Sequence, residues 1–201
     1  MKKLLIAFLV MAVLMCGCAA KQTQPEPQQT LEPETAAEPE AEEAPAFNLE
    51  TYKSAVNQFR RDVMDNTVNV GNIVNYESGY ISSYQKIDGG SPKAEKVVEA
   101  GYKWFEEKSG RKLSDIDLFN DSIRTQYAEL IITEIEGKEA EELDSYVRTM
   151  YDGYNTLYTM ATTGTPTSYE SFVLAANDAL TSVNDANSNI SLFCGEYPSE
   201  E

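Results

Sequence analysis

Histidine is absent from this 201-residue sequence, and positive charge is scarce. Without histidine, the chain lacks both the commonest general base and the commonest ligand of transition metals. Lysine and arginine number 16 against 33 aspartates and glutamates, which gives a net charge of −17. Binding to a phosphate backbone needs lysine and arginine, so we expect no nucleic-acid partner. The same balance disfavours docking of a folded domain on anionic lipid.

Cysteine is also rare, and the familiar catalytic motifs are missing. Of the three cysteines, Cys16 and Cys18 lie near the start and Cys194 near the end, so no internal disulfide framework is implied. There is no glycine-rich phosphate loop and no nucleophile elbow. Carboxylate metal sites in helical bundles use a Glu-x-x-His motif, which needs histidine. We therefore expect no enzyme, no metal and no cofactor; an enzyme that uses carboxylates alone is the remaining alternative.

The first residues have the pattern of an export signal. Lys2 and Lys3 precede an apolar run over residues 4–15, which is too short to span a bilayer and is typical of a signal peptide. The run ends in the sequence Leu-Met-Cys-Gly-Cys, with Gly17 directly before Cys18. This resembles the lipobox of bacterial lipoproteins, in which a small residue precedes the cysteine that is acylated after cleavage. An ordinary secretory leader is the alternative.

The resemblance implies a specific way of attachment. Residues 1–17 would be the signal peptide, and Cys18 would carry a diacylglycerol and an acyl chain such as palmitate. Cys16 is the poorer candidate, because cleavage would have to follow the bulky Met15. Two or more acyl chains hold a protein durably on a membrane. We therefore expect the chain on the extracytoplasmic side of the cell membrane or the outer membrane.

Residues 18–46 resemble a linker rather than a folded segment. From residue 19 onward they contain seven glutamates, five prolines and one lysine, and Leu31 is the only large aliphatic residue. Such a segment cannot bury enough apolar surface to offset the entropy of ordering it. We expect a disordered tether between the lipidated cysteine and a domain at residues 47–201.

The domain begins with a long heptad pattern over residues 49–87. Its core positions are spaced alternately three and four residues apart, which predicts one long helix with a single buried seam. The twelve positions of this seam are Leu49, Tyr52, Val56, Phe59, Val63, Asn66, Val70, Ile73, Glu77, Tyr80, Tyr84 and Ile87. A helix of this length needs other helices to cover it. Asn48 is its expected N-cap.

The remainder of the domain shows further helical stripes and no strand pattern. Helices are expected from Ser91 to about Gly110, from about Asp115 with Phe119 facing inward, and from Thr167 to the end. Near Gly137 the sequence allows either a turn between two helices or one unbroken helix whose middle part is exposed to solvent. The fold predicted is all-α, an antiparallel bundle of four to five helices built on the long first helix.

Two polar residues interrupt the apolar seam. Asn66 and Glu77 would need polar partners if they were buried, and they could then fix the register or line a ligand cavity. The alternative is that the seam faces solvent at these two positions. Cys194, at the end of the last helix, is expected to be a buried small side chain rather than a reactive thiol.

The tyrosines offer a second candidate surface. Tyr80 and Tyr84 share one helical face with Tyr76, and Tyr154 and Tyr158 share another with Tyr151. A tyrosine combines an apolar ring with a polar tip, which suits a groove for a peptide or glycan as well as the rim of a core. The candidate ligand-binding residues are therefore Asn66, Glu77, Tyr80, Tyr84, Tyr154 and Tyr158.

These observations favour a membrane-anchored lipoprotein with a non-enzymatic role in the cell envelope. Its domain would act as a binding or scaffold module for an envelope protein, a peptide or a glycan. The alternative function is that of a sensor or solute-binding bundle, which holds a small ligand between its helices.

Overall fold

The computed structural model describes residues 48–133, 136–164 and 168–195. The predicted signal peptide, the predicted lipidation site Cys18 and the predicted linker lie outside these residues. Within them the chain forms five helices and no strand, so the domain is the all-α helical bundle that the sequence predicts. None of these helices is both long enough and apolar enough to cross a membrane.

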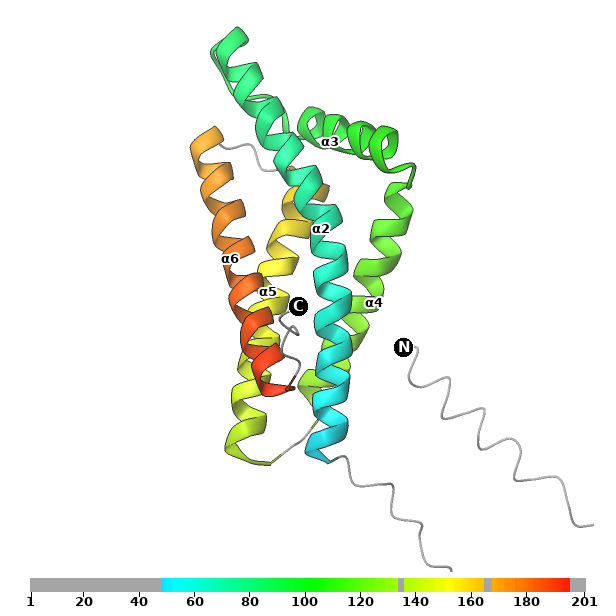
Figure 1. The fold of residues 1–201 in the computed structure, drawn as a ribbon. Coiled ribbons are helices and arrows are strands. Elements are labelled where there is room, and N and C mark those ends of the chain that lie inside the picture. The colour runs from blue at the N-terminus through cyan, green and yellow to red at the C-terminus, as the bar shows by residue number, and fades with distance from the viewer. Residues whose placement is uncertain (1–47, 134–135, 165–167, 196–201) are drawn as a thin grey trace, which may run out of the picture. The chain divides into compact units, whose positions relative to one another are not determined.

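Four helices run alternately up and down the bundle, and a fifth crosses one end. The helices are α2 (Leu49–Asp88), α3 (Ala94–Ser109), α4 (Leu113–Ile132), α5 (Lys138–Thr163) and α6 (Tyr169–Phe193). In Figure 1, α2 and α5 rise, α4 and α6 descend, and α3 lies across one end. Helices α4 and α5 are separate, and Gly137 directly precedes α5. The alternative of one unbroken helix through this region is therefore wrong.

Most of the α2 seam is buried as predicted. Tyr52, Phe59, Val63 and Ile73 are at most 2% exposed and lie in the central core with residues of all four other helices. Figure 1 shows the reason, since α2 is flanked by other helices along most of its length. The prediction fails at the far end, where Ile87 is 82% exposed because α2 projects beyond its neighbours.

The predicted boundaries and faces of α3 and α4 need correction. Helix α3 begins at Ala94, three residues after the predicted cap at Ser91. Helix α4 begins at Leu113, and Asp115 accepts a hydrogen bond from the backbone N–H of Lys112 at 3.1 Å. Phe119 does not face inward but is 48% exposed, which places an aromatic ring on the surface of the bundle.

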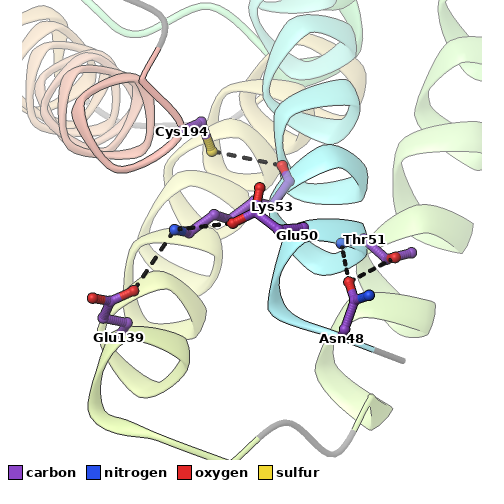
Figure 2. A network of polar contacts seen from close by, with 6 residues as sticks. All are labelled: Asn48, Glu50, Thr51, Lys53, Glu139 and Cys194. Carbon is purple, nitrogen blue, oxygen red and sulfur yellow. Dashed lines mark hydrogen bonds and ion pairs between the residues drawn. The ribbon is translucent and has the colours of Figure 1, made fainter. Parts of the chain in front are cut away.

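The beginning of α2 is fixed by a side-chain cap and by contacts with two distant helices (Figure 2). Asn48 Oδ1 accepts a hydrogen bond from the backbone N–H of Thr51 at 2.9 Å, which confirms the predicted N-cap. Lys53 lies 3.7 Å from a carboxylate oxygen of Glu139 in α5, and its backbone oxygen accepts from Cys194 Sγ at 3.6 Å. Cys194 is only partly buried, less than the sequence predicts.

Helices α5 and α6 pack very closely at Gly153. A Cβ atom at this position would lie 2.8 Å from the backbone oxygen of Ala179 and 3.0 Å from Val183 Cγ2. Only glycine permits this approach, so the contact fixes the pairing of the two helices. The remaining helices, α2, α3 and α4, bury apolar side chains in the same core.

Candidate functional site

Asn66 lies at the centre of a buried polar chain that joins three helices. It is 1% exposed, and its Nδ2 donates a hydrogen bond to Tyr154 Oη in α5 at 2.7 Å. Tyr154 Oη in turn donates to Asn120 Oδ1 in α4 at 3.2 Å. The suggestion that the seam faces solvent at Asn66 is therefore wrong, because its amide is enclosed between α2, α5 and α4.

This polar chain is incomplete at one end. Asn66 Oδ1 is sealed from solvent and has no hydrogen-bond partner among the described residues. A buried acceptor without a partner costs about 1–3 kcal/mol of stability. Burial also raises the pKa of Tyr154, which keeps its hydroxyl protonated and able to donate. The arrangement therefore sacrifices stability at Asn66, which is typical of residues kept for function rather than for folding.

A surface cavity of about 320 Å³ opens beside Asn66 between α2 and the beginning of α4. We call it the Asn66 pocket; its lining residues are Asp65, Asn66, Val68, Asn69, Arg111 and Phe119. Its rim combines a carboxylate, a guanidinium and two exposed apolar side chains. Ligand sites commonly have such a mixed lining of apolar surface and a few polar groups.

Replacing Asn66 by leucine should stabilise the ligand-free domain. The change removes the unpartnered oxygen and also the hydrogen bond from Asn66 Nδ2 to Tyr154 Oη, while Tyr154 Oη keeps its own donated hydrogen bond to Asn120. We expect a gain of about 1 kcal/mol in the free energy of unfolding, measured by urea denaturation. Asn72→Leu at an exposed position of α2 is the control, because it measures the gain from helix propensity alone. A clear loss of stability for Asn66→Leu relative to this control would contradict the prediction.

Glu77, the second polar residue of the seam, is buried even more completely. It is 0% exposed, and neither carboxyl oxygen has a partner among the described residues, so the suggestion of solvent exposure is wrong here too. Burial raises its pKa from 4.5 to about 9. At neutral pH the side chain is consequently a neutral carboxylic acid, held in the interior at a cost to stability.

Helix α3 covers Glu77 through a glycine. A Cβ atom on Gly101 would lie 2.7 Å from Glu77 Oε1, so only a residue without a side chain fits at this contact. On the same helix, the pKa of Tyr102 is raised first by burial, then by Glu77, and further by Asp117 and Tyr158. Glu77 is therefore enclosed where α3 packs on the rest of the bundle.

The tyrosine residues divide between separate places instead of lining one groove. Tyr154 is fully buried, whereas Tyr158 is partly buried and donates to Asp117 Oδ1 at 2.8 Å. Tyr80 and Tyr84 are partly buried near the projecting end of α2, with ring centroids 6.5 Å apart. The structure joins Asn66 to Tyr154 by the hydrogen bond described above, and the ring centroids of Tyr154 and Tyr158 lie 6.3 Å apart.

Two residues near Asn66 were not predicted from the sequence: Arg111, which lines the Asn66 pocket, and Asn120, which ends the buried polar chain. Arg111 lies in the short connection before α4, and Asn120 follows the surface residue Phe119. A signal was present for Arg111, because it is one of only 16 basic residues in an acidic chain. Over the described parts of the chain, no group of three or more histidine, cysteine, aspartate or glutamate side chains could hold a metal ion.

Comparisons with known proteins leave the interpretation to the residues themselves. No protein-family model, curated protein or solved structure matches this chain.

Proposed function

We propose that this chain is a bacterial lipoprotein, anchored to the membrane through an acylated Cys18, and that its helical domain is a non-enzymatic binding module of the cell envelope. The observation that carries the anchor is Gly17-Cys18, which follows an apolar run of signal-peptide length after the single residue Cys16. The acidic linker then places the domain at a distance from the lipid surface, on the extracytoplasmic side.

The anchor is tested by metabolic labelling with a fatty acid in the bacterium that expresses the chain. Cys18→Ala should abolish the label and leave the unprocessed precursor, because the acylated thiol is lost. Cys16→Ser is the matched control and should be labelled and processed as the parent is. Loss of the label in the Cys16 variant alone would refute the assignment to Cys18.

A small-ligand role is the second candidate, and the Asn66 pocket favours it over a purely structural scaffold. A scaffold surface gains nothing from a buried acceptor without a partner, whereas a ligand site uses such polar groups to orient what it binds. An envelope protein or a glycan is the other kind of partner, and it would contact the exposed faces of the bundle.

A further inference from the structure

We propose that the Asn66 pocket binds a short apolar peptide by its two charged ends, a proposal that rests on the binding role proposed above. The first support is the pair of charges at its rim. Asp65 from α2 and Arg111 from the connection before α4 line the same cavity. Neither charged group has an ion pair or side-chain hydrogen bond within the part of the chain that the structure describes. Opposite charges left in one cavity suit a ligand that carries both.

The buried amide gives an independent reason to expect a ligand. Asn66 lines the same cavity and is 1% exposed, yet its Oδ1 lacks a donor. The peptide N–H of a dipeptide is a donor of the kind that this oxygen lacks, and because the oxygen is sealed from solvent, the side chains that cover it have to move when the ligand binds. Because Nδ2 is already used by Tyr154, the orientation of the Asn66 amide is fixed before any ligand arrives. Such preorganisation reduces the entropy lost on binding.

The apolar surroundings indicate what the ligand carries between its charges. Val68 is 62% exposed and Phe119 is 48% exposed, both at this cavity. A second hollow of about 490 Å³ shares Arg111 and Phe119 with the first and adds Leu118, which is 69% exposed. The second hollow is also lined by Asp115 and Ser122, so each hollow offers apolar surface beside polar groups. This apolar surface fits two apolar side chains, one on each side of Phe119.

These features together define one arrangement of the ligand. The amino group of the peptide lies at Asp65, and its carboxylate lies at Arg111, where the two hollows meet. The first side chain contacts Val68 and Phe119, and the second contacts Phe119 and Leu118. Arginine suits this role, because its planar guanidinium matches a carboxylate in two parallel hydrogen bonds.

Isothermal titration of the purified full chain with leucyl-leucine tests the arrangement. We expect binding with a dissociation constant of about 1 mM or tighter. N-acetyl-leucyl-leucine lacks the amino charge and leucyl-leucine amide lacks the carboxylate, so each should bind at least about ten-fold more weakly. Glycyl-glycine keeps both charges without apolar side chains and should also bind more weakly. Equal affinity for all four probes, or no binding of leucyl-leucine, would overturn the proposal.

Charge-neutral variants locate the binding in the Asn66 pocket. Arg111→Gln and Asp65→Asn should each weaken the binding of leucyl-leucine by at least about ten-fold. Arg124→Gln and Asp121→Asn, on the exposed surface of α4 away from this cavity, remove the same charges and should leave the affinity unchanged. Equal losses in both pairs would refute the site. The binding measurements do not depend on the acylation of Cys18, so a failure of this proposal can be told apart from a failure of the proposed membrane anchor.

Discussion

Raising the pH from about 5 to about 9 should lower the free energy of unfolding steeply, because Glu77 must stay protonated in the folded domain. Its pKa is raised from 4.5 to about 9 by burial. The free energy of unfolding is highest below pH 4.5, where Glu77 is protonated in both the folded and the unfolded chain, and it decreases as pH rises, by up to about 1.4 kcal/mol per unit. The total loss is on the order of 5 kcal/mol and is complete above the folded-state pKa. Urea denaturation at a series of pH values measures this slope.

A conservative variant isolates the contribution of Glu77 from that of other groups. Glu77→Gln keeps the shape of the side chain and cannot ionise, so its stability should change little between pH 5 and 9. Glu129→Gln, at an exposed position of α4, should keep the parent slope. Measurements stop below pH 10, because a tyrosine has an ordinary pKa of 10.0, whereas burial raises the pKa of Tyr52 and of Tyr158 to about 12. Above pH 10 these tyrosines would ionise first in the unfolded chain and lower the stability for a second reason. A parent slope that persists in Glu77→Gln would show that this carboxyl is not the cause.

Phe59→Ala should destabilise the domain by about 3–5 kcal/mol, since it removes a fully buried ring and leaves a cavity. Phe59 lies in the best-patterned part of α2, and its ring centroid is 6.4 Å from that of Tyr127 in α4. The expected loss is a large share of a typical domain stability of roughly 5–15 kcal/mol. The midpoint of urea denaturation should therefore fall sharply.

Phe119→Ala is the matched control for this prediction. It removes the same ring from a position that is 48% exposed, so we expect a loss of less than about 1 kcal/mol. Equal losses in the two variants would mean that the burial of the α2 seam does not determine stability.

The long helix could be predicted from the sequence, because its heptad pattern places apolar residues on one face, and the other helices pack against that face. The seam is buried from Tyr52 to Glu77, which is the part of α2 that other helices cover. Ile87 continues the pattern but is exposed, since periodicity alone does not say where the partner helices end. Phe119 was misplaced for a similar reason: an aromatic residue was assumed to be buried, whereas here it lines a surface cavity.

The candidate site was only half predictable. Asn66 could be found, because a polar residue in an apolar seam contradicts the local pattern. Its connection to Tyr154 spans 88 residues and that of Tyr154 to Asn120 spans 34, so no local spacing reveals them. Arg111 is placed at the cavity by the packing of α4 on α2, which is a tertiary feature. The closure of Glu77 by Gly101 likewise depends on the crossing of α3 over α2.

The α2 seam is a packed core, and we propose that Asn66 is kept in it for binding at a cost in stability. Parallel urea denaturation of Phe59→Ala and Asn66→Leu tests both statements. We predict changes of opposite sign: a loss of about 3–5 kcal/mol for Phe59→Ala and a gain of about 1 kcal/mol for Asn66→Leu. Losses in both variants would show that Asn66 supports the fold instead, and an unchanged Phe59→Ala variant would contradict the buried seam itself.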